Sequence, residues 1–357
     1  MKKDSPLRLA LIGCGHIAQK RHLPILRNMR GVQLVAVADT DPRNLSLVAG
    51  QYKVPNCYEN HSALLENPGI DAVLVSTPPA SHFAHTRDVL ESGRHLYVDS
   101  PLALSVEDCE ELIELGNRTK SVATVGMNLR YHSLIQRATR CIKGGLIGPV
   151  HAISAIFSTP SRGKRGDIFP AWRQPDTVDG NVFSESALQH FDTWRALTGA
   201  EFTDVTVECA KIGGPVSLAA KMKGDTAGQC SPIVVAAVFS EYSGDNSEIR
   251  LIGREGTIAL SLYRFDGFSY CPALVAQGSI SQHLRGVSEG LRLIRQGARN
   301  LVQGGEYGTT FRLQLEAFVD ACRGGKPPLV SLADGKAAVA ASLAAFQSLQ
   351  TNQRVIL

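Results

Sequence analysis

The residues Gly13-Cys14-Gly15-His16-Ile17-Ala18 have types and spacing suited to holding a diphosphate. They close an apolar run that begins at Leu7 and is typical of a buried strand, and they open a segment with helical periodicity. Gly13 permits a tight turn, Gly15 lets the backbone approach a ligand closely, and Ala18 lets the helix pack against the sheet. The N-terminus of that helix favours the negative charge of a diphosphate.

A carboxylate stands at the end of the next predicted strand, residues 32–39. Asp39 can accept hydrogen bonds from an adenosine ribose, and together with the glycine pattern it predicts a dinucleotide site. The same carboxylate would repel a 2′-phosphate, and Thr40 and Asp41 supply no positive charge, although Arg43 lies close in the chain. We therefore predict NAD(H) in preference to NADP(H).

The elements that must position this site follow a βαβ pattern over the first third of the chain. Further strands are predicted over 70–78, 94–101 and 121–128, and helices over 42–52, 81–91, 105–119, 133–143, 306–323 and 334–349. Beyond about residue 128, longer strands with two-residue alternation predict an open, mainly antiparallel sheet. We predict an α/β protein with a doubly wound parallel sheet in residues 1–128 and a C-terminal α+β domain in 129–357.

Composition excludes several classes of function. The chain has 357 residues, 44% of them hydrophobic and 20% charged, with a net charge of +4. This scattered charge does not indicate a nucleic-acid or membrane-surface partner, and no run approaches the ~20 apolar residues of a membrane span. The eight cysteines are dispersed without zinc spacing. We expect a cytoplasmic protein with reduced thiols, no bound metal and a small-molecule partner.

Motifs spread along nearly the whole chain resemble the glucose–fructose oxidoreductase / inositol 2-dehydrogenase (Gfo/Idh/MocA) family. They are GCGHIA at 13–18, STPPASH at 76–82, ESGRHLYVDSPLAL at 91–104, NLRYHS at 128–133, GGLIGPVHAI at 144–153, LIGREGTIAL at 251–260 and FVDACRGGKPPLVSLADGKAAVAASLAAFQS at 318–348. The resemblance implies a Rossmann domain, a second domain whose open sheet commonly forms homo-oligomer contacts, and closing helices that pack back on the Rossmann domain.

The cofactor contacts predicted from the fingerprint and the family-like strand ends form one set. They are Gly13, Gly15, His16, Ile17, Ala18, Asp39, Thr77, Pro78, His82 and Asp99. The resemblance further implies an NAD-dependent oxidoreductase acting on a sugar-like or polyol-type small molecule.

The sequence departs from the family where the chemistry is expected. Family members that oxidise sugars or inositols usually carry Glu-Lys-Pro at the end of the fifth strand, where this chain has Asp99-Ser100-Pro101. The lysine hydrogen-bonds the reacting oxygen, and a histidine four residues after an aspartate accepts the proton. In residues 179–192, an ungapped match puts Glu185 and Gln189 at those two positions, whereas a one-residue slip puts Ser186 and His190 there. The Asp192-Thr193-Trp194 run that follows favours the ungapped register.

The candidate residues follow from this comparison, and each also has a purely structural interpretation. The catalytic candidates are His190, Glu185, Ser100 and Tyr131, and the substrate-binding candidates are Arg130, His132, Trp172 and Gln189. Alcohol oxidation needs a base and a donor to the developing alkoxide. The leading hypothesis is therefore an oxidoreductase with non-standard proton-transfer residues. The alternatives are a catalytically inactive nucleotide-binding or regulatory homologue, and an NAD-assisted lyase, hydrolase or imine reductase.

Overall fold

The computed structural model describes residues 5–159, 181–209, 215–226, 229–241, 244–264, 267–274 and 305–357. The chain forms two compact units. Unit 1 contains Met1–Asn128 and Phe311–Val339, and unit 2 contains Leu129–Thr310 and Ala340–Leu357. No helix among the described residues is long and apolar enough to cross a membrane. The seven cysteines whose side chains are described are free thiols.

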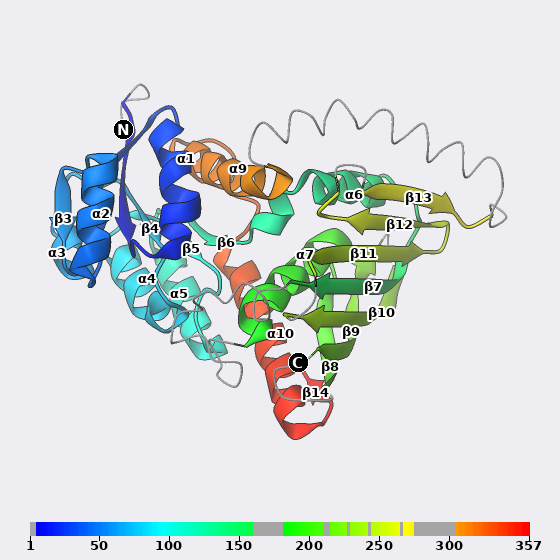
Figure 1. Ribbon diagram of the computed structural model, residues 1–357. Helices are drawn as coiled ribbons and strands as arrows, with labels where there is room; N and C mark the ends of the chain where they lie inside the picture. The colour runs from blue at the N-terminus through cyan, green and yellow to red at the C-terminus, as the bar shows by residue number, and fades with distance from the viewer. Residues whose placement is uncertain are drawn as a thin grey trace. The chain divides into compact units, whose positions relative to one another are not determined.

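Unit 1 is built on a six-stranded sheet with the order β3-β2-β1-β4-β5-β6. Its strands are β1 (Leu7–Ile12), β2 (Val32–Ala38), β3 (Asn56–Tyr58), β4 (Ala72–Val75), β5 (His95–Asp99) and β6 (Ala123–Gly126). Strands β3, β4, β5 and β6 are labelled in Figure 1. Every neighbouring pair is parallel. The predicted doubly wound parallel sheet is confirmed, and its order reverses beside β1, where such sheets bind ligands.

The helices of unit 1 lie between these parallel strands in the chain, except for α9, which follows the strands of unit 2. They are the π-helical turn η1 (Ala18–His22), α1 (Leu23–Asn28), α2 (Pro42–Tyr52), α3 (His61–Leu65), the 3-10 turn η2 (Pro79–Ser81), α4 (His82–Glu91), α5 (Val106–Arg118) and most of α9 (Gly305–Cys322). Ser105 caps α5 by accepting a 3.0 Å hydrogen bond from the Asp108 N–H. Leu315 and Phe318 of α9 join the core around Leu7 and Leu11.

Unit 2 is built on an eight-stranded sheet with the order β13-β12-β11-β7-β10-β9-β8-β14. Its strands are β7 (Val150–Ser158), β8 (Glu201–Cys209), β9 (Val216–Thr226), β10 (Gln229–Ser240), β11 (Asn246–Gly253), β12 (Gly256–Ser261), β13 (Phe268–Pro272) and β14 (Val355–Ile356). Only β7 and β10 pair in parallel among its neighbours. The expected open, mainly antiparallel sheet is therefore confirmed.

Two-residue alternation gives this second sheet one buried and one exposed face. Its helices are η3 (Asn128–Tyr131), α6 (Ser133–Lys143), the π-helical turn η4 (Phe183–Ala187), α7 (Leu188–Thr198) and α10 (Leu332–Thr351), which begins in unit 1. Residues of α6, α7 and α10 join the inward-facing strand residues in one core. The opposite face leaves Ile156, Val234 and Val238 at 43%, 53% and 40% exposure.

Candidate nucleotide site and proton-transfer residues

The glycine loop leaves the carboxyl end of β1 in a conformation that requires Gly13. Its φ is +93°, and a Cβ atom there would lie 2.4 Å from the Ser76 carbonyl oxygen. At Gly15, by contrast, a Cβ atom would meet no described atom within 4 Å. Ala18 is fully buried at the start of the helix. The loop therefore packs tightly on β4 at Gly13 and opens at Gly15, where a diphosphate would approach the backbone.

Asp39 lies at the end of β2 with its carboxylate turned to the glycine loop. One oxygen accepts a 2.6 Å hydrogen bond from the Cys14 N–H, and the other accepts a 2.7 Å bond from the Asp41 N–H. A carboxylate offers about four lone-pair sites. Two acceptor positions therefore remain for ribose hydroxyls, and the group is held rigidly where the fingerprint predicts a ribose.

The cation nearest to Asp39 in the chain is bound to another residue. Asp41 accepts two hydrogen bonds from the Arg43 guanidinium, at 3.1 and 2.9 Å, and also accepts one from the Arg43 N–H. The hydrogen bonds from Arg43 lower the pKa of Asp41, so the pair stays ionised at neutral pH. Asp41 thus engages two of the five guanidinium N–H groups of Arg43, whose side chain is 90% exposed.

Asp99, at the end of β5, is fixed by two side chains of unit 1. His22 places Nε2 3.0 Å from both carboxylate oxygens, and Ser76 donates a 2.6 Å hydrogen bond to Oδ2. Burial raises the pKa of Asp99, but attraction to His22 and the hydrogen bonds outweigh it and hold the pKa below its ordinary value. The predicted cofactor residue Asp99 therefore remains a carboxylate that ties the ends of β4 and β5 to η1.

The turn after β4 contains the other predicted cofactor residues of unit 1. Thr77 and Pro78 lead into η2, and His82 begins α4 with its side chain fully enclosed. Both ring nitrogens of His82 contact backbone carbonyls, so the imidazole has no nitrogen left for a direct hydrogen bond to a cofactor. The half-buried Ser100 follows β5 directly. His16 and Ile17 are exposed in the open part of the glycine loop.

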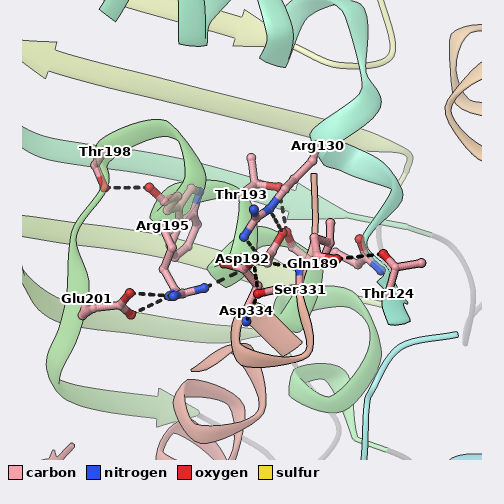
Figure 2. Close-up of polar contacts among 12 residues, drawn as sticks. Thr124, Arg130, Gln189, Asp192, Thr193, Arg195, Thr198, Glu201, Ser331 and Asp334 are labelled. Carbon is pink, nitrogen blue, oxygen red and sulfur yellow. Dashed lines mark hydrogen bonds and ion pairs between the residues drawn. The ribbon is translucent and has the colours of Figure 1, made fainter. Parts of the chain in front are cut away.

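In unit 2, Arg130 forms an ion pair with Asp192 rather than extending into solvent. Its guanidinium donates two hydrogen bonds to the carboxylate, at 2.7 and 2.6 Å, and the Asp192 side chain is fully buried. Figure 2 shows Asp192 between Arg130 and Arg195, with Arg195 extending to Glu201. This chain of charges joins η3 to α7 and to the start of β8. A substrate contact from Arg130 would have to compete with Asp192.

His132 is the N-cap of α6. Its Nδ1 accepts a 3.2 Å hydrogen bond from the Leu134 N–H, and Nε2 donates a 3.0 Å bond to the Leu262 carbonyl. The two bonds define one neutral tautomer in a buried position. Tyr131, its neighbour, is also buried, with 7% of its surface exposed. Tyr131 and His132 are therefore both buried, immediately before the first residue of α6.

His190 points from α7 into an aromatic cluster. Its ring centroid lies 4.9 Å from that of Phe157, 5.6 Å from Phe239 and 6.3 Å from Trp194. Nδ1 donates a 2.9 Å hydrogen bond to the Ser186 carbonyl. Burial lowers the pKa of His190 to about 4, so the imidazole is neutral over the physiological range. It is both enclosed and weakly basic, which are poor properties for a catalytic base.

The remaining candidates are described only in part. Gln189 is half-buried in the first turn of α7, and its carbonyl accepts a 2.7 Å hydrogen bond from the Thr193 hydroxyl. Glu185 lies in η4, with its side chain outside the described residues. Trp172 also lies outside the described residues.

Three polar residues of unit 1 were absent from the sequence prediction. His22 reaches Asp99 from one turn into the first helix, Ser76 reaches it from the end of β4, and His85 contacts the Thr77 hydroxyl. For His85, the sequence did contain one indication, because His82 and His85 are three residues apart and therefore share a helix face. Nothing in the local sequence marks His22 as a partner for Asp99, 77 positions away.

Comparison with known proteins agrees with this geometry. Residues 7–127 match a family model described as an oxidoreductase family with an NAD-binding Rossmann fold (GFO_IDH_MocA). The chain is 24% identical to a scyllo-inositol 2-dehydrogenase (NAD(+)) of Bacillus subtilis, over 99% of this chain and 97% of that protein. It is 23% identical to a myo-inositol 2-dehydrogenase of Thermotoga maritima, over 98% of each.

The fold is also similar to that of solved structures. The WlbA dehydrogenase from Bordetella pertussis, in complex with NADH and UDP-GlcNAcA, superposes with a TM-score of 0.78 at 17% identity. The match covers 99% of this chain and 98% of that one. The order of strands in unit 1 is the one expected of a Rossmann fold, and residues 7–127 match the family model over this sheet.

Proposed function

We propose that the protein is an NAD(H)-dependent oxidoreductase of the Gfo/Idh/MocA type that acts on a sugar-like or polyol-type small molecule. The match of residues 7–127 to the family model for the NAD-binding Rossmann fold supports this proposal. One observation carries the proposal: the Asp39 carboxylate is held by the Cys14 N–H inside the glycine loop, where it can receive a ribose. Relatives named as inositol dehydrogenases match this chain along nearly its full length, which supports the substrate class.

The residues of unit 1 fit a dinucleotide. The open backbone around Gly15 and the exposed His16 and Ile17 would receive the diphosphate, and Asp39 the adenosine ribose. When bound, NAD⁺ supplies the hydride acceptor for the carbon being oxidised. Asp39 would repel a 2′-phosphate, and Arg43 is already paired with Asp41. These two features support NAD(H) over NADP(H).

Proton transfer would depend on residues other than the family's usual lysine and histidine. Ser100 takes the lysine position and would donate a hydrogen bond to the reacting oxygen without adding positive charge. His190 is enclosed by aromatic rings, and burial lowers its pKa to about 4. Gln189 cannot accept a proton at a useful rate. We therefore assign the base role to the carboxylate of Glu185, at the family's aspartate position.

The second candidate function is nucleotide binding without turnover. The enclosure of His190 and the pairing of Arg130 with Asp192 both favour it, because each removes a polar group from the set that would act on substrate. Removing one donor from an oxyanion-like centre typically lowers kcat by about 10²–10³-fold. A protein lacking both the lysine and the histidine would fall far below an ordinary dehydrogenase.

One nucleotide-binding titration and one activity assay distinguish the two candidate functions. NADH fluorescence would be titrated on the full chain, and NADH formation would then be followed with a panel of inositols and sugars. The oxidoreductase predicts saturable NADH binding and turnover that Glu185→Gln abolishes and His190→Phe retains. Binding without turnover on any polyol would support the second function. Failure to bind NADH or NADPH would refute both.

We further propose that the exposed face of the unit 2 sheet pairs with a second copy of this chain. Val238 lies beside Ile156, and Val234 beside Ala152, in the parallel register of β10 and β7. These positions form an apolar patch on an open face, as expected of a contact surface. Val234→Asp should shift the protein to smaller particles in sedimentation, whereas Glu114→Lys, at an exposed position on α5 of unit 1, should not. An unchanged oligomer, or a monomeric wild type, would contradict this.

A further inference from the structure

Two histidines of α4 hold the Thr77 turn from one helix face. His82 Nε2 lies 2.8 Å from the Thr77 carbonyl oxygen, and His85 Nδ1 lies 3.2 Å from the Thr77 hydroxyl. We propose that these histidines are positioning residues for the dinucleotide, with His82 as an imidazolium that donates from both nitrogens and His85 as a neutral acceptor. The link to the dinucleotide rests on the proposed function.

The assignment for His82 follows from its partners. Its Nδ1 lies 2.6 Å from the Pro101 carbonyl oxygen, so both ring nitrogens face acceptors that have no hydrogen to give. A neutral imidazole carries only one N–H and would press a lone pair against one of these oxygens. The side chain is 1% exposed, so solvent cannot relieve that contact. Two N–H groups satisfy both carbonyls and tie the end of β4 to the end of β5.

His85, unlike His82, must have one ring nitrogen without a hydrogen in order to accept a hydrogen bond. Burial lowers its pKa to about 4, and the neighbouring His61 and His82 act in the same direction, while Asp88 opposes them. The neutral ring can accept the Thr77 hydroxyl hydrogen at Nδ1. His61 packs against His85 with ring centroids 4.3 Å apart and is itself bonded to Asp88. His82 also helps to lower the pKa of Asp99, which ends the strand that precedes Pro101.

The Thr77 turn transmits this arrangement to the glycine loop. A Cβ atom built on Gly13 would lie 2.8 Å from the Thr77 methyl group and 2.4 Å from the Ser76 carbonyl oxygen. The Thr77 turn is therefore packed directly against the first glycine of the fingerprint. Any displacement of Thr77 would move the loop that seats the diphosphate. The two histidines thus act on the cofactor through Thr77 rather than by touching it.

The protonation states can be measured in the ligand-free protein. Nitrogen-15 NMR of histidine-labelled full chain at pH 7, assigned by single His→Gln variants, should show two protonated ring nitrogens for His82. His85 should show one protonated nitrogen and one bare nitrogen. A neutral His82 would overturn the proposal. This test is independent of the proposed function, because it requires no nucleotide.

The effect on the cofactor is tested by NADH titration of matched variants. His85→Leu and Thr77→Val each remove the same hydrogen bond, and each should weaken NADH binding by about tenfold. Their combination should weaken it no further, and His85→Asn, whose amide oxygen can accept, should restore most of the affinity. Additive losses, or no loss in either single variant, would overturn the positioning role. If the wild type binds no NADH, the proposed function fails, while the NMR result still judges the assignment of His82.

Discussion

The loop edge of unit 1 and helix α7 of unit 2 hold their polar side chains in opposite ways. At the loop edge, Asp39 and His82 bond to backbone N–H and carbonyl groups of neighbouring loops. In α7, Asp192 is enclosed by Arg130 and Arg195, and His190 by aromatic rings. The loops at strand ends carry backbone N–H and carbonyl groups that need hydrogen-bond partners, and these loops leave one side open to a ligand. A helix lying on a sheet turns one face into the core, and residues on that face become part of the packing.

This difference predicts how amino-acid substitutions would affect the two parts of the proposed function, cofactor binding and proton transfer. The nucleotide site depends mainly on backbone groups and two glycines, which the sequence retains. Proton transfer depends on individual side chains, and those at the expected positions are Ser100, Glu185 and Gln189. We therefore expect substitutions to have separable effects on cofactor binding and on turnover.

The largest effect is expected at the buried ion pair of α7. Asp192→Ala leaves the Arg130 guanidinium buried without its carboxylate, which should lower the free energy of unfolding by about 3–5 kcal/mol. Thermal and urea unfolding would measure the loss. Arg130→Met combined with Asp192→Leu should recover much of it, and Glu114→Ala, in the exposed Glu114–Arg118 pair, should have no measurable effect. A small change from Asp192→Ala would show that the pair is not a core interaction.

The next effect separates the two glycines of the loop. Gly13→Ala places a Cβ against Ser76 at a positive φ, so it should destabilise the fold by about 1–3 kcal/mol and weaken NADH binding about a hundredfold. Gly15→Ala should leave the melting temperature unchanged but weaken NADH binding about tenfold. Calorimetry and NADH titration measure the two quantities. Equal melting temperatures for both variants would contradict the tight packing at Gly13.

Cofactor preference should respond to Asp39 alone. Asp39→Asn removes the charge that repels a 2′-phosphate while keeping an acceptor oxygen, so the ratio of NADPH to NADH affinity should rise about tenfold. Arg43→Ala in the wild-type background should leave the ratio unchanged, because Asp41 holds the guanidinium. Competitive titration with both reduced nucleotides measures the ratio. A lower ratio in Arg43→Ala would show that Arg43 reaches the cofactor.

The smallest effect at neutral pH is expected at His190. Its pKa is lowered from 6.5 to about 4 by burial, so the unfolded chain gains a proton that the folded protein does not as the pH falls from about 6.5 to 4. Stability from this group is complete above pH 6.5 and declines through that window. His190→Phe should flatten this part of the curve, measured by urea unfolding at several pH values. An unchanged pH dependence would place His190 in a more solvated position.

Much of the fold could be predicted from local pattern. The helices over 42–52 and 133–143 have the predicted bounds. The short elements β3 and α3 were not predicted. For β3, the reason is that a strand of three residues has too few positions to show alternation. The glycine loop and Asp39 were predictable because strand, turn and carboxylate are close in sequence. His22 was not, because its partner Asp99 ends another strand, 77 positions away.

By itself the sequence determined the parallel nucleotide-binding sheet, the mainly antiparallel second sheet and the position of the glycine loop, because periodicity and turn residues act over short distances. Only the tertiary structure decided what the charged side chains do. Arg130 pairs with Asp192 across 62 positions, and His82 contacts the Pro101 carbonyl, 19 positions away, after another strand end. A side chain's burial and partners set its charge and reactivity, and both come from segments that folding brings together.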